Sequence, residues 1–235
     1  MVCERSRIYR ATGTMLFNEF RDMKDIAIYG FGGFGREIAS IILSINSIQP
    51  EWNIVGFFDD GVAVGTENRY GSVLGGIEAL NQHAEELNVV FAIASPVIVQ
   101  KLVLAITNPK ISFPTIIAPT VLFFDRETFS FGKGNVLCHN VRVSCDVTLG
   151  DFNLLNGGVS LGHDVKMGSY NMLQPETRIS GETVVGNANF FGVRSLVLQG
   201  IKIGNDTRIG TGSVVMRKTK DGMTYFGNPA KILAP

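Results

Sequence analysis

Histidine and cysteine, the side chains that most often bind transition metals, are scarce in this chain. Its 235 residues include three of each, and the cysteines Cys3, Cys138 and Cys145 show no CxxC spacing. A catalytic zinc site usually takes three protein ligands held close together. We therefore expect no metal site, and we expect free thiols in a reducing compartment.

An excess of charge and a long apolar run are also missing. Lys and Arg number 21, as do Asp and Glu, so nothing indicates binding to nucleic acid or to an anionic membrane surface. No run of eighteen apolar residues is present, so no membrane span is expected. The first twenty residues lack the apolar segment of a signal peptide. The sequence predicts a cytoplasmic protein.

What the chain does have is a six-residue repeat between Leu137 and Val215. Every sixth residue is large and apolar, without a change of phase, and the next residue is often glycine. A fixed period of this kind predicts a parallel β-helix built from hexapeptides. The repeated apolar residues are Leu137, Val143, Leu149, Leu155, Leu161, Met167, Leu173, Ile179, Val185, Phe191, Val197, Ile203, Ile209 and Val215.

The repeat also predicts which residues are neighbours in space. Three hexapeptides form one coil of eighteen residues around a triangular core, so residues eighteen apart stack about 4.8 Å from each other. Each coil buries its apolar side chains only with the help of the next coil. Corners favour glycine, asparagine and aspartate, because some of them need a positive φ.

The N-terminal part predicts an α/β domain of half-Rossmann type. A buried strand at 26–29 is followed by the glycine-rich turn Gly30–Gly35 and by isoleucines at helical spacing. A second strand at 53–58 completes a βαβ unit with a right-handed crossover. Further expected elements are a helix at 76–87, a strand at 89–94, a helix at 96–107 and a linking strand at 111–117.

These patterns divide the chain into three parts. Residues 1–24 show no clear pattern, and we expect a poorly ordered extension. Residues 25–117 form the Rossmann-like domain. Residues 118–235 form the β-helix, with a C-terminal tail after Val215.

The turn Gly30–Gly35 fits GxGxxG between a strand and a helix. Such a turn lets a phosphate approach the backbone amides at a helix N-terminus, and Asp59 has about the spacing of an acid that accepts ribose hydroxyls. Three interpretations compete: NAD or NADP binding, a purely structural turn, and binding of one nucleotide or nucleotide-sugar. The domain has no room for a second mononucleotide half, which favours the third.

The three histidines are His83, His139 and His163. We expect a solvated side chain for His83 and consider the other two as general bases. Asp164 follows His163 directly. Its carboxylate can meet the His163 imidazole only at a corner, because neighbouring residues in a strand point to opposite sides. Gly181 stacks one coil beyond His163, where its N–H could stabilise an oxyanion. His139 stacks in the same way below Gly157, so stacking alone does not separate the two histidines.

The chain resembles bacterial hexapeptide-repeat sugar acetyltransferases that carry a small N-terminal nucleotide-sugar-binding domain. This family includes UDP-4-amino-sugar N-acetyltransferases and enzymes of the sialic acid O-acetyltransferase type. The resemblance covers residues 26–233. Its motifs are IxIYGxGGxG from residue 26, FxDD from 57, AIAS from 92, LGHD from 161 and GNPAK from 227.

The resemblance implies a left-handed β-helix, a homotrimer, and active sites between neighbouring subunits. It also implies three groups of site residues. The catalytic group is His163, Asp164 and Asn156. Contacts to acetyl-CoA fall at Gly181, Met172, Val193 and Thr211, and some relatives carry a second histidine in place of Met172. The nucleotide-sugar contacts include residues of the glycine turn and residues that follow other strands: Gly30, Gly32, Gly33, Phe34, Asp59, Asp60 and Ala94.

We therefore predict acetyl transfer from acetyl-CoA to an amine or hydroxyl of a sugar. A UDP-linked 4-amino sugar is the favoured acceptor, and His163 is the favoured base. Two alternatives remain open: a non-catalytic trimer that binds a nucleotide-sugar, and an O-acetyltransferase acting on a sialic acid or another small acceptor.

Overall fold

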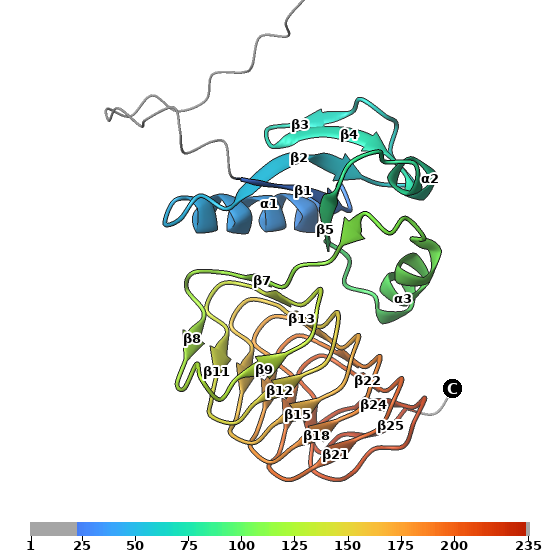
Figure 1. Ribbon diagram of the computed structural model, residues 1–235. Coiled ribbons are helices and arrows are strands. Elements are labelled where there is room, and N and C mark those ends of the chain that lie inside the picture. The colour runs from blue at the N-terminus through green and yellow to red at the C-terminus, as the bar shows by residue number, and fades with distance from the viewer. Residues whose placement is uncertain (1–22, 234–235) are drawn as a thin grey trace, which may run out of the picture.

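The computed structural model describes residues 23–233, and Figure 1 shows an α/β domain standing on one end of a parallel β-helix. The extension predicted at 1–24 lies almost wholly outside the described residues. Strand β1 already begins at Lys24. Among the described residues, no helix is both long enough and apolar enough to cross a membrane.

The α/β domain has one sheet of six strands in the order β3-β4-β2-β1-β5-β6, in which only the β3–β4 pair is antiparallel. Because β2 and β5 flank β1 on opposite sides, the chain changes direction at the carboxyl end of β1, where α/β sheets bind ligands. The elements are β1 (Lys24–Tyr29), α1 (Gly33–Asn46), β2 (Trp52–Phe58), β3 (Glu67–Asn68), β4 (Gly71–Gly75), α2 (Ile77–Asn81), β5 (Leu87–Phe91), α3 (Pro96–Ala105) and β6 (Ile111–Ser112).

Most elements of this domain lie close to where the sequence predicts them. The helix predicted at 76–87 is shorter, because only α2 is helical there. The strand predicted at 111–117 is two short strands, β6 and β7 (Ile116–Ile117). The hairpin of β3 and β4 has no counterpart in the prediction, because its strands are short and rich in polar residues and glycine.

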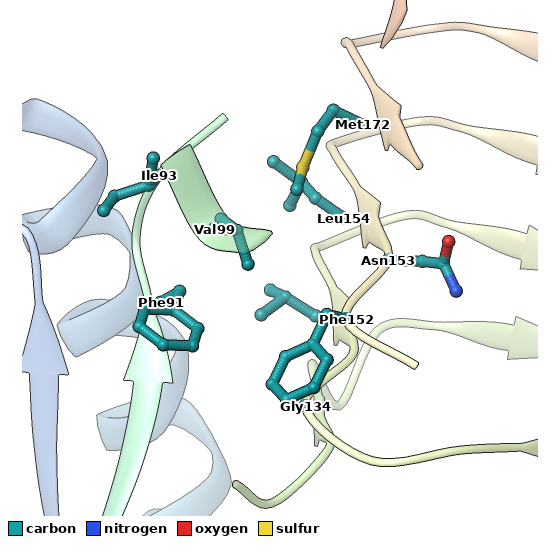
Figure 2. Close-up of a pocket in the computed structure, with 9 residues that line it drawn as sticks. Phe91, Ile93, Val99, Gly134, Phe152, Asn153, Leu154 and Met172 are labelled. Atoms are coloured by element: carbon teal, nitrogen blue, oxygen red, sulfur yellow. The ribbon is translucent and has the colours of Figure 1, made fainter. Parts of the chain in front are cut away.

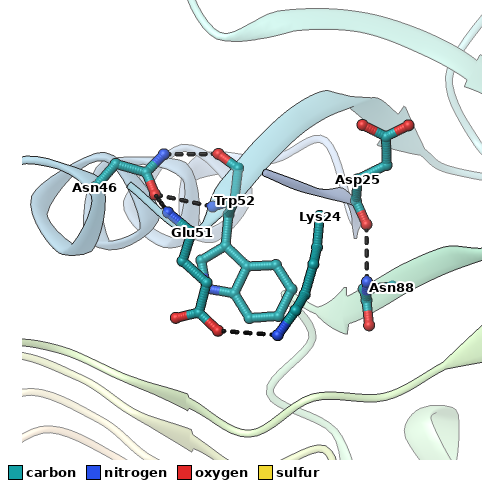
Figure 3. A network of polar contacts seen from close by, with 6 residues as sticks. All are labelled: Lys24, Asp25, Asn46, Glu51, Trp52 and Asn88. Atoms are coloured by element: carbon teal, nitrogen blue, oxygen red, sulfur yellow. Dashed lines mark hydrogen bonds and ion pairs between the residues drawn. The ribbon is translucent and has the colours of Figure 1, made fainter. Parts of the chain in front are cut away.

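Helix α1 packs on the sheet through Ile38, Ile41 and Ile42, which are all buried. Its last residue, Asn46, then ties the helix to β2. The Asn46 side chain accepts from the Trp52 backbone N–H at 3.0 Å and donates to the Trp52 carbonyl at 2.6 Å (Figure 3). These bonds close the loop between the two elements and leave the opposite, N-terminal end of α1 beside β1.

The β-helix is a triangular prism with three faces, named here after one strand of each. The β13 face contains β7, β10 (Val136–Leu137), β13 (Leu154–Leu155), β16 (Met172–Leu173), β19 (Phe190–Phe191), β22 (Arg208–Ile209), β24 (Thr224–Phe226) and β25 (Lys231–Ile232). The β14 face contains β8 (Leu122–Phe123), β11 (Arg142–Val143), β14 (Ser160–Leu161), β17 (Arg178–Ile179), β20 (Leu196–Val197) and β23 (Val214–Val215). The β15 face contains β9 (Ser130–Phe131), β12 (Thr148–Leu149), β15 (Lys166–Met167), β18 (Val184–Val185) and β21 (Lys202–Ile203).

The register confirms the predicted fold, an α/β domain followed by a left-handed parallel β-helix. Val143 pairs with Leu161, and Leu161 with Ile179, each eighteen residues on. All fourteen repeated apolar residues are at most 4% exposed. Their side chains form a continuous column of apolar contacts along the axis, and burial of that column stabilises the prism.

One corner of the core is polar and forms a ladder of asparagines that the apolar repeat did not reveal. Asn135, Asn153, Asn171 and Asn189 are almost fully buried and lie on successive coils. The side-chain amide of each later asparagine donates to the side-chain oxygen of the one before, at 2.9 to 3.0 Å. The ladder pairs buried polar groups and fixes the register of the coils.

The two domains share an apolar interface. The outer residues of the β13 face, including Leu154 and Met172, are buried against Phe91 and Val99 of the α/β domain (Figure 2). The space left between them is only about 10 Å³. The α/β domain is therefore packed firmly on the first coils rather than tethered to them.

Candidate active site

A groove of about 540 Å³ lies on the β14 face and along the corner where this face meets the β15 face. Its lining comes from five consecutive coils, so the eighteen-residue register places the residues at equal steps along the axis. The lining residues are Phe124, Arg142, Ser144, Ser160, Leu161, Gly162, His163, Arg178, Ser180, Gly181, Leu198 and Gln199.

His163 and Asp164 lie at this corner and contact each other. The His163 Nδ1 atom is 2.8 Å from Asp164 Oδ2. Asp164 has a φ of 58°, in the left-handed region that aspartate tolerates better than most residues. This turn brings the two neighbouring side chains to the same side, which answers the geometric question that the sequence left open. The carboxylate selects the tautomer with the proton on Nδ1 and leaves Nε2 as the base.

Gly181 lies directly against the other side of the imidazole. A Cβ atom at position 181 would be 2.6 Å from His163 Nε2, so only glycine leaves room for the ring. The Gly181 carbonyl accepts from Gly200 N–H at 2.9 Å, whereas within residues 23–233 no acceptor is found for the Gly181 N–H. The structure thus places an available backbone donor next to the candidate base.

His139 has a different environment, and this separates the two histidines. Its Nδ1 atom is 2.7 Å from Thr120 Oγ1. A Cβ at Gly157 would meet no atom of the His139 ring, and its nearest neighbour would be the His139 carbonyl oxygen at 3.6 Å. Within residues 23–233, His139 therefore has neither a carboxylate partner nor a glycine packed on its ring. His83, the third histidine, is half-buried and its Nδ1 atom contacts the Glu85 carbonyl.

Three other residues suggested by the resemblance lie at a different corner. Asn156, Val193 and Thr211 are at the corner between the β13 and β14 faces, and the Asn156 side chain accepts from Gly157 N–H at 2.7 Å. A single chain does not bring them into the groove beside His163. Met172 is also outside the groove, because it is 2% exposed and packs against the α/β domain.

The glycine turn of the α/β domain presents the N-terminus of α1. Gly32 caps the helix without a side-chain hydrogen bond, and Gly32 and Gly33 are exposed, with Phe34 half-buried. Gly30 has a φ of 116°, and a Cβ there would come within 2.9 Å of the Ala92 carbonyl oxygen. The turn therefore depends on glycine and leaves the first amides of α1 open to an anion.

Asp59 and Asp60 hold this turn from the end of β2. The two oxygens of Asp59 accept from the backbone N–H groups of Phe31 and Gly61, each at 2.9 Å. Asp60 accepts from the Tyr29 hydroxyl at 2.5 Å and from the N–H of Ile77 at 2.8 Å. These bonds link the turn to the first turn of α2.

Tyr29 was not predicted as part of this site. Burial, and then its hydrogen bond to Asp60, raises the pKa of the tyrosine well above its ordinary value. Asp59 and Asp60 also line a second groove, of about 460 Å³, that continues along β4 and α2. Ala94, half-buried, follows β5 on the other side of β1. The predicted nucleotide contacts thus come from the carboxyl ends of neighbouring strands.

Comparison with known proteins finds a match for the N-terminal part of the chain and similar structures for nearly all of it. Residues 25–110 match the PglD N-terminal domain family. Among curated proteins no sequence matches significantly. The acetyltransferase domain of PglB from Neisseria gonorrhoeae FA1090, in complex with acetyl coenzyme A, is 25% identical over 90% of this chain and 100% of that one, with a TM-score of 0.81.

Two further structures are similar over both domains. WeeI from Acinetobacter baumannii AYE is 25% identical over 90% of this chain and 100% of that one, with a TM-score of 0.80. A variant of GDP-perosamine N-acetyltransferase from Caulobacter crescentus, in complex with CoA and GDP-perosamine, is 26% identical over 90% and 97%, with a TM-score of 0.77.

Residues 25–110 thus match the PglD N-terminal domain, and the chain as a whole is similar to acetyltransferases of known structure, one of them a GDP-perosamine N-acetyltransferase. This confirms the family predicted from the sequence motifs and the enzyme class, acetyltransferase. In this acetyltransferase, Arg142, Arg178 and Phe124 are groove residues that the sequence analysis did not select. The eighteen-residue spacing could have found the arginines, because both stack on Ser160, three residues before His163.

Proposed function

We propose that the enzyme transfers the acetyl group of acetyl-CoA to an amine or hydroxyl of a nucleotide-linked sugar, with a UDP-linked 4-amino sugar as the favoured acceptor. One observation carries the proposal: the His163 ring is held between the Asp164 carboxylate and Gly181, whose N–H has no acceptor in residues 23–233. Relatives of similar architecture bind acetyl coenzyme A, or CoA together with GDP-perosamine.

In the proposed mechanism, the acceptor nitrogen or oxygen attacks the thioester carbonyl with its lone pair, and His163 Nε2 removes the proton from that atom. Negative charge develops on the carbonyl oxygen of the tetrahedral intermediate, and the Gly181 N–H donates a hydrogen bond to it. Collapse of the intermediate breaks the carbon–sulfur bond, and the CoA thiolate takes the proton from His163. Asp164 stabilises the imidazolium that forms between the two proton transfers.

The α/β domain would bind the nucleotide. The free amides at the start of α1 suit a phosphate, since the helix dipole favours an anion there. Asp59 and Asp60 hold the turn in place and lie beside a groove large enough for part of a nucleoside. This half of the proposal uses the predicted contacts Gly30, Gly32, Gly33, Phe34, Asp59, Asp60 and Ala94.

We further propose that the active enzyme is a homotrimer. The position of Asn156, Val193 and Thr211 supports this, because they lie at a different corner of the prism from His163. Packing around a threefold axis parallel to the prism would bring that corner of one subunit toward the His163 corner of the next. The coenzyme would then lie between subunits.

The proposal is tested by measuring the release of free CoA with a thiol reagent while UDP-amino sugars are screened as acceptors. His163→Ala should abolish release and keep acetyl-CoA binding, and His139→Ala should remain close to wild type. The opposite result would assign the base to His139. Calorimetry with acetyl-CoA separates the enzyme from a non-catalytic nucleotide-sugar-binding trimer, which would show no binding.

A further inference from the structure

The walls of the His163 groove change along the axis of the β-helix. Phe124 and Arg142 lie on the coils before that of His163, toward the β7 end, and Arg178 and Leu198 lie on the coils beyond it. The α/β domain stands at the β7 end of the prism (Figure 1). A rotation about an axis parallel to the prism keeps this order in every subunit, so the groove has an end near the nucleotide domain and an end far from it.

We propose that Arg142, together with Phe124, recognises the acceptor, and that the acceptor carries an anionic group, phosphate or carboxylate, close to the reacting amine or hydroxyl. The inference rests on the proposed function and names a substrate feature that the general base alone does not specify. The exposed guanidinium of Arg142 and the exposed ring of Phe124 support it, because both lie in the same groove as His163, toward the β7 end.

Arg142 is available for an anionic ligand. It is the outer residue of β11, and it pairs in register with Ser160, which in turn pairs with Arg178. Within the described residues, neither arginine forms an ion pair with an acidic side chain. A guanidinium presents a planar fork of donors that matches the oxygens of a phosphate or a carboxylate. In a groove it is also less screened than on an open surface.

The path of a nucleotide-linked sugar favours Arg142 over Arg178. The phosphates of such a molecule connect the nucleoside, in the α/β domain, to the sugar, which must reach His163. Arg142 lies one coil nearer to the β7 end, above which the sheet of the α/β domain stands (Figure 1), than Ser160, which is on the coil of His163, a step of about 4.8 Å. The sugar-proximal phosphate, or a carboxylate on the sugar, therefore passes Arg142. Arg178 lies one coil farther, level with Gly181, on the side left for the thioester.

Phe124 is placed by an irregularity of the first coil. Leu122 pairs with Arg142, 20 residues on, whereas Ser130 pairs with Thr148, 18 residues on, so the corner between β8 and β9 has two extra residues. Arg126 fixes this corner because its guanidinium lies over the rings of Phe123, Phe129 and Phe131, at 4.8, 5.6 and 5.3 Å from their centroids.

Phe124 itself remains 64% exposed in the groove. Its ring is a flat apolar surface on which the C–H face of a sugar can stack. Arg142 and Phe124 together thus offer one contact for the anionic group and one for the sugar ring. This pairing fits an anionic sugar better than a neutral one.

Equilibrium calorimetry without acetyl-CoA tests the inference. The probes are a UDP-linked 4-amino sugar, the methyl glycoside of the same sugar, which has no anionic group, and sialic acid as a carboxylate sugar. Arg142→Gln should weaken binding of the charged acceptor about tenfold or more, the usual effect of losing a charged hydrogen bond. It should leave the methyl glycoside unchanged. A loss confined to the UDP-sugar identifies phosphate as the anionic group, and a loss confined to sialic acid identifies carboxylate.

Two matched variants complete the experiment. Arg208→Gln removes the same charge from β22, on another face, and should bind every probe as the wild type does. Arg178→Gln removes it from the same groove, one coil beyond His163, and should leave acceptor binding within twofold. Phe124→Ala should weaken the anionic sugars and the methyl glycoside alike, because its contact does not depend on an anionic group.

The inference is overturned if Arg142→Gln binds the anionic acceptors as tightly as the wild type, or if its binding of the methyl glycoside weakens equally. An equal loss in Arg142→Gln and Arg178→Gln would show a diffuse positive field instead of a site, and would also overturn the inference. A wild type that binds neither the UDP-sugar nor sialic acid would overturn it as well. Because binding is measured without turnover, failure of the proposed function shows separately, as a wild type that binds the sugar but releases no CoA.

Discussion

The His163 imidazole packs on Gly181, one coil away, with no room for a side chain between them. Gly181→Ala should therefore push the ring out of its position beside the oxyanion donor. We expect kcat to fall about 100-fold or more, the usual effect of displacing a general base, while the protein remains folded. Steady-state rates of CoA release measure the change.

Gly157→Ala is the matched control for this substitution. Gly157 occupies the same position in its hexapeptide, but a Cβ there would be 3.6 Å from the nearest atom, an ordinary contact. Its kcat should stay close to that of the wild type. Equal losses in the two glycine variants would mean that the glycines serve the fold of the corner and not the position of His163.

A second prediction concerns Asp164. Asp164→Asn keeps the shape of the side chain and tolerates the φ of 58°, but it removes the charge that orients His163. We expect kcat to drop about 10- to 1,000-fold with little change in the KM for acetyl-CoA. Asp146→Asn is the control, because Asp146 has the same φ one coil earlier. A kcat for Asp164→Asn within twofold of wild type would refute the orienting role.

A third prediction concerns the asparagine ladder. Asn171→Ala removes the donor to Asn153 and the acceptor of the Asn189 side chain, both inside the core. Leaving buried polar groups unpaired should lower the free energy of unfolding by about 2–5 kcal/mol. Denaturant unfolding measures this. Asn187→Ala, at an exposed corner, is expected to change it far less; equal losses would contradict the importance of burial.

A fourth prediction concerns pH. Burial, aided by the Glu37 carboxylate, raises the pKa of the Cys138 thiol from 9.0 to about 12. Below pH 9 the thiol is protonated in both states. Between pH 9 and 12 the unfolded chain loses this proton and the folded chain keeps it, so the free energy of unfolding falls as pH rises, by at most about 1.4 kcal/mol per pH unit.

Cys138→Ala should remove this contribution. Unfolding free energies of wild type and variant at pH 8, 10 and 11 give the comparison, and other groups that titrate in this range cancel in the difference. The difference between the two proteins should shift in favour of the variant as pH rises. A difference that stays constant over this range would show that the thiol ionises equally in both states.

The six-residue period predicted the β-helix because each inward position repeats along the chain, and it also predicted that Gly181 stacks on His163. It did not separate His163 from His139, since the direction of an imidazole depends on local partners such as Asp164 and Thr120. The asparagine ladder had a detectable signal, asparagine recurring every eighteen residues from Asn135, but a search for apolar residues passes over it.

Other parts of the site were beyond the reach of the sequence for different reasons. The bond between Tyr29 and Asp60 joins residues 31 positions apart, and no local period reports it. The packing of Met172 against Phe91 and Val99 depends on how the two domains meet. Phe124 reaches the groove because its corner breaks the repeat, and an irregular corner has no predictable direction.

The last strands have a consequence for how the protein behaves at high concentration. A parallel β-helix exposes at each end a rung of unpaired backbone groups, which is a template for the next molecule. Here β25 turns back antiparallel on β24, and Ala230 N–H donates to the Val214 carbonyl. At the opposite end, the α/β domain packs on the outer side of the β13 face, where Phe91 and Met172 lie in the same interface. The template at the C-terminal end is therefore capped, which opposes end-to-end growth into fibrils from that end.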